Sequence, residues 1–334
     1  MKVLLINPQR SLKTPDRFVS IPYELAGLAH FLMINGHETD ILDTVGEDFL
    51  TKELINGVYK CGLPDDKVSK LIEDFKPQIV CISCPNIQRY PNVVNISKIV
   101  KKLNPETLVT IEGLYATINA TEIIKEPTID FIIMGEVEIT FLNLLNKVKS
   151  NNRDASDLKA VSYKSGEGVF VSPDRILIDA LDTLPPPAYE LLPLENYFKY
   201  SKHDSLTKHK RQISMITSRG CVHKCGNCAS ANIWGQVWRA KSVPFLLIEL
   251  EILLDIYKIQ EVNFEDLSMT GDIPRIHSLC REIVHRNLQF KWSVYLHNQE
   301  LDLQTKRLMI QAGCQRFHFG AESEEKSIFP CKTI

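Results

Sequence analysis

The chain has 334 residues, of which 44% are hydrophobic and 24% charged, and its formal net charge is −2. These values are ordinary for a folded protein, and the near-zero charge lacks the basic excess of a nucleic-acid-binding surface. The N-terminal MKVLLINPQR lacks a small-residue cleavage site, and no apolar run approaches the roughly 20 residues of a membrane helix. We therefore expect two domains of roughly 100–200 residues each, with no nucleic-acid partner and no membrane span.

The first part of the chain alternates short apolar runs with amphipathic segments. The run at 2–6 ends at Asn7-Pro8, and the segment that follows repeats leucine and alanine at helical spacing until Gly36. Strands that alternate with helices predict a parallel sheet with helices on both faces. Residues 1–148 are therefore expected to form a doubly wound α/β domain. Its further strands are expected at 39–43, 79–84, 107–113 and 129–135.

Ligands of open parallel sheets bind beyond the carboxyl ends of the strands. In this domain the loops at that edge read NPQRS, SCPNIQRYP, EGLYAT and GEVEIT. Neither a GxGxxG dinucleotide signature nor a GxxxxGK[ST] phosphate loop is present in the chain. We therefore do not expect this domain to hold NAD or ATP.

The middle of the chain, residues 149–205, shows a weaker pattern and is expected to be an inter-domain linker. Residues 160–172, AVSYKSGEGVFVS, predict a hairpin with a glycine-containing turn. Residues 182–198, DTLPPPAYELLPLENYF, are proline-rich and are expected to be extended.

The last region, residues 206–334, returns to β/α alternation. Its pattern suits part of a TIM-like β/α barrel. The chain ends eleven residues after Ser323, and we expect a barrel that is truncated at its C-terminal side. Strands are expected within 211–221, 260–266, 290–296 and 315–323, and helices within 243–257, 273–286 and 301–313.

The nine cysteines are an odd number in a chain without an export signal, which favours a reducing compartment. Cys81 and Cys84 form a CxxC within an apolar run, and we interpret them as buried small residues. The other group is Cys221, Cys225 and Cys228, spaced C-x3-C-x2-C. Three thiolates suit a 4Fe–4S cluster with one open iron, because such clusters are held by cysteine. Zinc with a fourth ligand remains the alternative.

This cysteine spacing, just after the first strand of a β/α chain, resembles the radical S-adenosylmethionine superfamily. Three downstream stretches, VWRAKS, VNFEDLS and AGCQRFHFGAES, are similar to that family's sequences. The resemblance implies that the open iron binds the amino and carboxylate groups of S-adenosylmethionine. It also implies that Glu265 or Asp266 accepts from the methionine ammonium, that Arg239 pairs with a carboxylate, and that the ribose is contacted by Glu322 and Ser323.

The N-terminal half resembles the cobalamin-binding domain that precedes many radical S-adenosylmethionine barrels. The similar stretches are KVLLINPQ, IPYELAGLAHFLMINGHETDILDT and the region 79–145. The DxHxxG motif is absent, so no histidine is expected on the cobalt, and we interpret His37 as structural. The residues implied to face the corrin are Asn7, Ser83, Gly113, Tyr115, Gly135 and Glu136.

Together these resemblances imply a cobalamin-dependent radical S-adenosylmethionine enzyme in the cytoplasm. The implied reaction is methyl transfer to an unactivated centre of a small molecule through a 5′-deoxyadenosyl radical. The implied cofactors are a 4Fe–4S cluster, S-adenosylmethionine and cobalamin, with an electron donor such as a flavodoxin or ferredoxin. Radical cyclisation or rearrangement, and a non-catalytic cobalamin- or iron–sulfur-binding fragment, are the alternatives. No catalytic residue is assigned, and the substrate is not defined.

Overall fold

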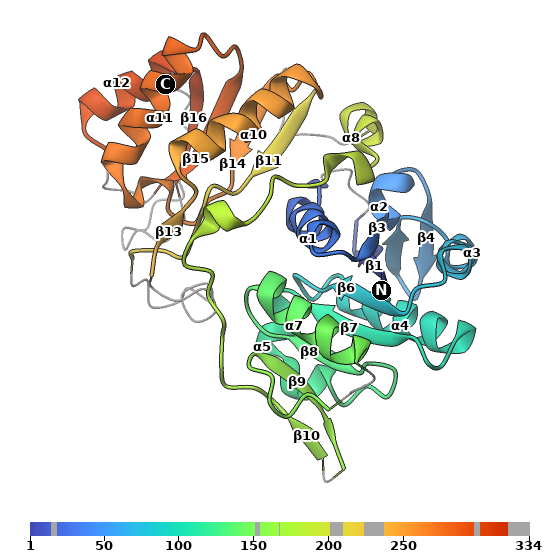
Figure 1. The fold of residues 1–334 in the computed structure, drawn as a ribbon. Helices are drawn as coiled ribbons and strands as arrows, with labels where there is room; N and C mark the ends of the chain where they lie inside the picture. Colours follow the sequence, from blue (N-terminus) through green and yellow to red (C-terminus); the bar gives the residue numbers. More distant parts are fainter. Residues whose placement is uncertain are drawn as a thin grey trace. The chain divides into compact units, whose positions relative to one another are not determined.

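The computed structural model describes residues 1–14, 19–150, 154–166, 168–200, 210–223, 237–296 and 301–319. The chain divides into two compact units, coloured from blue to yellow-green and mostly from yellow to red in Figure 1. The first unit contains residues 1–178 and 185–202, and the second contains residues 179–184 and 203–334. Within the described residues, no helix is both long and apolar enough to cross a membrane.

The first unit is built on a seven-stranded sheet in the order β10-β9-β8-β7-β6-β1-β3. Five neighbouring strands are parallel, and β9 and β10 add an antiparallel edge. The chain order reverses between β1 and β6, which is the position where open α/β sheets bind ligands. The strands are β1 (Lys2–Asn7), β3 (Glu38–Asp43), β6 (Ile79–Ser83), β7 (Leu108–Glu112), β8 (Phe131–Ile133), β9 (Val161–Ser165) and β10 (Gly168–Phe170).

Helices cover both faces of this sheet, because alternate strand residues on each face are apolar. In β1, Leu4 and Ile6 join the core beneath α3 (Asp65–Phe75) and α4 (Tyr90–Leu103). On the other face, α1 packs against α7. The doubly wound α/β class predicted for this region is therefore confirmed. The remaining helices are α1 (Tyr23–Ile34), α2 (Thr44–Glu47), α5 (Leu114–Ile118), α6 (Ala120–Ile123), α7 (Val137–Lys149) and α8 (Leu194–Tyr200).

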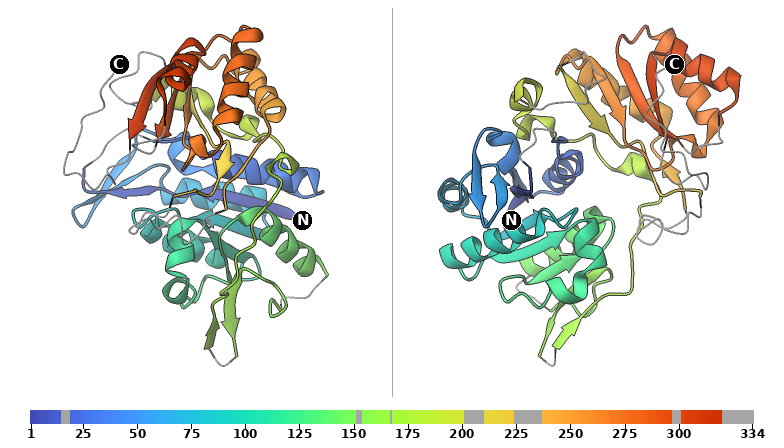
Figure 2. Two further views of the ribbon diagram at one scale, coloured as in Figure 1. Left: turned by 90° about the vertical axis from the view of Figure 1, so that its left-hand side faces the viewer. Right: turned by 180° about the vertical axis from the view of Figure 1, so that it is seen from behind.

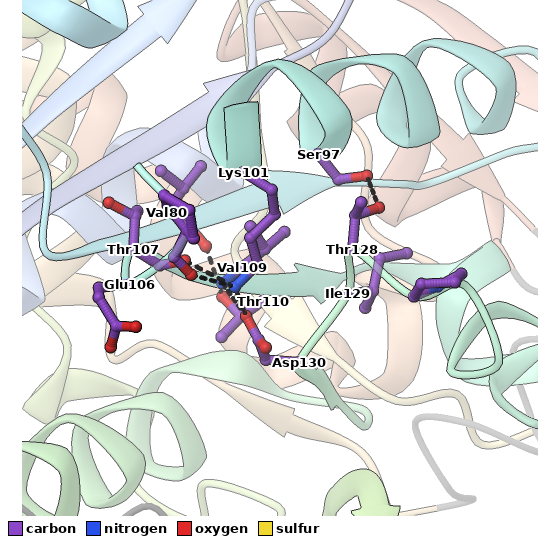
Figure 3. A network of polar contacts seen from close by, with 12 residues as sticks. Val80, Ser97, Lys101, Glu106, Thr107, Val109, Thr110, Thr128, Ile129 and Asp130 are labelled. Carbon is purple, nitrogen blue, oxygen red and sulfur yellow. Dashed lines mark hydrogen bonds and ion pairs between the residues drawn. The ribbon is translucent and has the colours of Figure 1, made fainter. Parts of the chain in front are cut away.

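The amino edge of the sheet is closed by a polar network around Lys101 and Asp130 (Figure 3). The Lys101 ammonium, near the end of α4, donates to the Thr107 carbonyl at 2.9 Å and to Asp130 Oδ2 at 2.7 Å. The same Asp130 oxygen accepts from the Val109 amide at 2.7 Å. The network fixes the start of β7, at the edge opposite the strand-end loops. His37 lies at this edge too, buried just before β3.

Much of the segment expected as a linker is packed on the first unit. The predicted hairpin forms from β9 and β10, and β9 pairs with β8. Further along, α8 contacts α2 at the other end of the sheet. A small antiparallel sheet is formed by β2 (Arg10–Leu12), β4 (Lys52–Ile55) and β5 (Val58–Cys61).

The second unit contains four parallel strands in the order β11-β14-β15-β16. Their helices lie on one side of the strands, as Figures 1 and 2 show. The facing strand residues, such as Phe264, Trp292 and Val294, are apolar and buried. Parallel strands with helices on one face agree with the predicted part of a β/α barrel. The elements are β11 (Gln212–Met215), α10 (Val243–Asp255), β14 (Glu261–Phe264), α11 (Ile273–His285), β15 (Lys291–Leu296), α12 (Leu303–Gln311) and β16 (Cys314–Phe319).

Candidate cofactor sites

The carboxyl edge of the first sheet brings together residues that lie far apart in the sequence. Ser83 at the end of β6 is the register partner of Glu112 at the end of β7. Gly113 follows Glu112 directly, and Asn7 ends the neighbouring β1. The predicted residues of this domain therefore share one edge, next to the point where the strand order reverses.

Asn7 is part of a buried network at this edge. Its side-chain amide donates to Asp43 Oδ1 at 2.7 Å, which also accepts from the Gly46 amide at 3.0 Å. The hydroxyl of Tyr197, on α8, donates to Asp43 Oδ2 at 2.6 Å. Burial raises the pKa of Asp43, and these hydrogen bonds oppose the rise. The network fixes the ends of β1 and β3, so the Asn7 side chain is held within the protein.

The loop after β1 is held by two side chains at the start of α4, those of Arg89 and Asn92. Arg89, which is buried, donates through Nη1 to the Pro8 carbonyl. The Asn92 side chain donates to the Gln9 carbonyl at 3.0 Å. Burial lowers the pKa of Arg89 to about 10, so the guanidinium remains charged at neutral pH. These two side chains were not predicted from the sequence, because they are more than 80 residues from the loop they hold.

Gly113 lies where the backbones of two loops approach closely. Its φ is +109°, and a Cβ built there would be 2.9 Å from the carbonyl carbon and oxygen of Cys84. Any larger residue would therefore collide with the backbone after β6. The loops after β6 and β7 therefore pack directly against each other, and the Cys84 amide donates to the Glu112 carbonyl at 2.8 Å.

Glu112 is a buried carboxyl at this edge that the sequence analysis did not single out. Burial raises its pKa to about 8, while a hydrogen bond from Ser83 acts in the opposite direction. Glu24 and Glu138 raise the pKa further through charge repulsion. At neutral pH the Glu112 carboxyl is therefore mostly protonated and can donate a hydrogen bond.

The other predicted residues of this domain lie on the neighbouring strand ends. Tyr115 is half-buried on α5, and its ring centroid is 5.7 Å from that of Tyr90. The Gly135 amide donates to Thr117 Oγ1 at 3.2 Å. Glu136 is buried and accepts from the Ile178 amide at 2.8 Å, so its carboxylate holds a later segment of the same unit.

Cys81 on β6 and Cys84 just after it have the character of core residues. Cys81 and Cys84 are both fully buried. Burial raises the pKa of the Cys84 thiol to about 12 and that of Cys81 further still. Such thiols stay protonated at neutral pH and are poor nucleophiles. The interpretation of these cysteines as buried small residues agrees with the structure.

In the second unit, the segment that carries Cys221 begins and ends on a short ladder. β12 (Ser218–Arg219) pairs antiparallel with β13 (Arg239–Ala240), so the two ends of the intervening loop lie side by side. Cys221 is half-buried and follows β12 after one glycine. Arg239 is buried within this ladder. Cys225 and Cys228 lie outside the described residues, as do Glu322 and Ser323.

Glu265 and Asp266, which follow β14, have different environments. Glu265 is exposed and accepts from Ser214 Oγ at 2.5 Å. Asp266 is buried, and its Oδ1 accepts from the Thr217 amide at 3.0 Å and from Thr217 Oγ1 at 2.9 Å. Its other oxygen, Oδ2, is buried and has no hydrogen-bond partner among the described residues. Asp266 therefore contacts the base of the segment between β12 and β13 that carries Cys221, which we call the cysteine loop. Its Oδ2 atom is left as a hydrogen-bond acceptor.

The face of the second sheet opposite its helices is polar. Ser293 Oγ donates to Asn263 Oδ1 at 2.7 Å, and the rings of Tyr295 and His318 stack with centroids 4.8 Å apart. Alternation along the strands produces this face, because polar residues recur every second position. The interior of a β/α barrel is usually filled by bulky apolar side chains, so a polar face here favours a ligand-binding role over a packed core. Its members are Gln212, Ser214, Glu261, Asn263, Glu265, Lys291, Ser293, Tyr295, Arg316 and His318.

Comparison with known proteins confirms the resemblance inferred from the sequence. Residues 17–145 match the family model of the B12 binding domain. The chain is 29% identical over 331 residues to an uncharacterized methyltransferase of Pyrococcus horikoshii, covering 98% of this chain and 67% of that protein. It is 27% identical to cytidylyl-2-hydroxyethylphosphonate methyltransferase of Streptomyces wedmorensis, covering 96% of this chain and 65% of the relative.

A third relative is a cyclase by name, whereas the first two are methyltransferases. The anaerobic magnesium-protoporphyrin IX monomethyl ester cyclase of Synechocystis is 23% identical, over 82% of this chain and 55% of its own length. Among solved structures, the radical S-adenosylmethionine methyltransferase TsrM of Kitasatospora setae has a TM-score of 0.74 at 17% identity, covering 97% of this chain and 60% of TsrM. The chain thus spans about two thirds or less of these relatives, and its fold is that of the matched part of TsrM.

Proposed function

We propose that this chain, a relative of cobalamin-dependent radical S-adenosylmethionine methyltransferases with a B12-binding domain at residues 17–145, is itself the catalytic part of such a methyltransferase. The observation that carries the proposal is the combination of two features in one chain. One is the B12-binding domain, and the other is a C-x3-C-x2-C loop at the head of a β/α unit. The substrate is a small molecule with an unactivated carbon or phosphorus centre.

The first unit fits a flat macrocycle at its carboxyl edge. The two loops approach so closely at Gly113 that no side chain fits where they meet. The Glu112 carboxyl supplies a hydrogen-bond donor at the same edge. Asn7 and Glu136 are occupied in internal hydrogen bonds, so their contribution is to fix the loops. Ser83, Tyr115 and the backbone at Gly135 are the further corrin contacts that we propose.

The second unit fits a cluster and S-adenosylmethionine by the chemistry of its donors. Cys221, Cys225 and Cys228 provide the three thiolates that leave one iron open. The buried, unpartnered Oδ2 of Asp266 is a suitable acceptor for an ammonium group, whereas Glu265 already accepts from Ser214. Glu322 and Ser323 remain proposed ribose contacts, and Arg239 remains a proposed partner of a carboxylate.

When bound, these groups would supply a 5′-deoxyadenosyl radical and a transferable methyl group. The residues of the chain have different tasks. The polar face that includes Asn263 and Ser293 offers hydrogen bonds for orienting the adenosine and the substrate. The apolar face with Trp292 packs against the helices and keeps the strands fixed.

The chain also requires a source of electrons to reduce the cluster. We propose a flavodoxin or ferredoxin for this role, and a cytoplasmic location. No disulfide joins two of the cysteines in the described part of the chain, which is in keeping with a reducing compartment.

The test is anaerobic reconstitution of the full chain with iron, sulfide and hydroxocobalamin, followed by metal analysis and spectroscopy. We expect about one 4Fe–4S cluster and one cobalamin per chain, because one thiolate triad and one B12-binding domain are present. Retention of zinc without iron uptake would contradict the cluster assignment.

The cyclase among the relatives makes radical cyclisation the second candidate reaction. The two reactions differ in the fate of the methyl group. With methyl-labelled methylcobalamin and a candidate substrate, methyl transfer places the label in the product. A product that forms without the label would favour cyclisation or rearrangement.

A further inference from the structure

We propose that Asp266 and Arg275 are positioning residues that clamp the base of the cysteine loop and thereby set the geometry of the cluster thiolates. The inference rests on the proposed role of Cys221, Cys225 and Cys228 as cluster ligands. The clamp itself consists of described residues only, and it lies in the second unit. Both side chains come from the chain after β14, about 50 residues beyond the start of the loop.

Asp266 holds the incoming end of the loop. One carboxylate oxygen, Oδ1, accepts from the Thr217 amide, from the Thr217 hydroxyl and from the Ser218 hydroxyl. Ser218 begins β12, three residues before Cys221. All of these groups are buried. Hydrogen bonds to a buried carboxylate are stronger than those between neutral groups, so the incoming end is fixed in direction as well as in position.

Arg275, on α11, holds both ends at once. Its Nε donates to the Lys241 carbonyl at 2.9 Å, and its Nη2 donates to the Thr217 carbonyl at 3.2 Å. Thr217 precedes β12, and Lys241 follows β13. The Lys241 amide also donates to the Thr217 carbonyl, at 2.9 Å. One guanidinium therefore bridges the two strands between which the cysteine loop emerges.

Trp238 holds the outgoing end of the cysteine loop through a hydrogen bond and close packing. Its indole Nε1 donates to the Ser268 carbonyl at 2.7 Å, and the Arg275 guanidinium carbon is 5.9 Å from its ring centroid. A Cβ at Gly271 would lie 2.7 Å from the indole nitrogen, so the ring packs closely against that backbone. The segment after β14 thus holds the incoming end through Asp266 and the outgoing end through Trp238.

The clamp at the base of the loop would favour cluster binding, because it orders the loop before iron is bound. Three thiolates have to meet one cluster, and a flexible loop would lose conformational entropy each time it closed on the iron. A base whose two ends are already joined reduces that loss. The charges are also compensated, since the Asp266 carboxylate and the Arg275 guanidinium attract one another. In the clamp Asp266 acts on the loop through Oδ1, apart from the ammonium contact proposed for Oδ2, and its test must separate the loop role from general stability.

The test uses the full chain with Asp266→Asn, Arg275→Gln and the milder Ser218→Ala. The matched control is Glu282→Gln, which removes a carboxylate on α11 whose ion pair with Arg286 is exposed. Amide hydrogen exchange is measured on the protein without iron. We expect exchange at least about tenfold faster at residues 218–221 and 239–241 in the clamp variants, because hydrogen bonds to charged groups are lost there. Glu282→Gln should match the wild type.

The second measurement is made after anaerobic reconstitution. We expect an iron chelator to remove the cluster about tenfold faster from Asp266→Asn and Arg275→Gln than from wild type, with an altered electron paramagnetic resonance spectrum of the reduced cluster. Arg275→Lys, which keeps the positive charge on a single nitrogen, should bring the chelator rate part of the way back to that of the wild type. Cobalamin binding by the first unit serves as the control for folding.

The outcomes separate this inference from the proposed function. If the wild type takes up no iron, the cluster assignment fails, while faster exchange in the iron-free variants still supports the clamp. Unchanged exchange at the loop base in all three clamp variants would overturn the clamp. Equal chelator rates in wild type, Asp266→Asn and Arg275→Gln would also overturn the clamp. If Asp266→Asn does not fold, Ser218→Ala decides by the same two measurements.

Discussion

Gly220 lies directly against the carbonyl oxygen of Val237. A Cβ built on Gly220 would be only 2.2 Å from that oxygen, and the φ of Gly220 is +81°. The two residues stand at the two ends of the cysteine loop, one before Cys221 and the other before β13. The absence of a side chain at Gly220 is therefore what lets the loop close at its base.

We expect Gly220→Ala to abolish most cluster incorporation. The added methyl group must push the two loop ends apart, at a cost of about 1–3 kcal/mol for overpacking in addition to the strain of a left-handed alanine. Gly36→Ala is the matched control, because Gly36 has a φ of +79° but nothing within 4 Å of the added Cβ. The control should lose about 1 kcal/mol of stability and keep full iron content. Equal iron content in both variants would contradict the steric argument.

The three cysteines of the loop should behave differently from those of the core. Cys221→Ala, Cys225→Ala or Cys228→Ala should each remove the cluster absorbance after reconstitution, because three thiolates are needed to hold it. Cys81→Ala and Cys84→Ala should leave the iron content unchanged and lower the stability by about 1 kcal/mol, since both side chains are buried. A loss of iron in Cys84→Ala would assign that thiol a role we do not give it.

The parallel strands could be predicted because continuous apolar runs mark strands that are buried on both faces. The hairpin of β4 and β5 was missed, although Asn56 and Gly57 form an NG turn with φ angles of 50° and 78°. The polar face of the second sheet also had a signal, namely the alternation in EVNFED. The clamp at Asp266 had none, because its contact with Ser218 depends on how β11 and β14 pair.

Tyr197→Phe should destabilise the first unit by about 1–3 kcal/mol. The variant removes the donor to Asp43 Oδ2 and leaves a buried carboxylate with fewer hydrogen bonds. Tyr200→Phe is the control, since Tyr200 is partly exposed on the same helix. Thermal unfolding of the full chain, followed at the transition of the first unit, measures the difference. Equal unfolding temperatures for the two variants would show that the network around Asp43 contributes little.

We expect bound cob(II)alamin to show no nitrogen hyperfine coupling from a protein histidine. The loop after β1 carries no DxHxxG motif, and His37 is buried at the opposite edge of the sheet. Electron paramagnetic resonance of the reduced, cobalamin-loaded chain measures this, and growth on ¹⁵N-histidine distinguishes protein nitrogen from that of the cofactor. A change of the hyperfine pattern with the isotope would show that a histidine binds the cobalt.

Glu112→Gln should make the protein more stable at alkaline pH relative to wild type. Burial raises the pKa of Glu112 from 4.5 to about 8, so the folded protein retains a proton that the unfolded chain releases. The wild type therefore loses stability as the pH rises from about 4.5 to 8, and the contribution is constant outside that window. Glutamine is uncharged throughout and can still pair with Ser83.

At pH 5 the two proteins should be similarly stable, and at pH 8.5 the variant should be favoured by on the order of 4 kcal/mol, given about 1.4 kcal/mol per pKa unit. Urea unfolding of the first-unit transition at both values measures this difference. Glu106→Gln, at an exposed position just before β7, is the control for the loss of a carboxylate as such. If the gap between Glu112→Gln and wild type is the same at pH 5 and pH 8.5, the Glu112 carboxyl is not held protonated in the folded state.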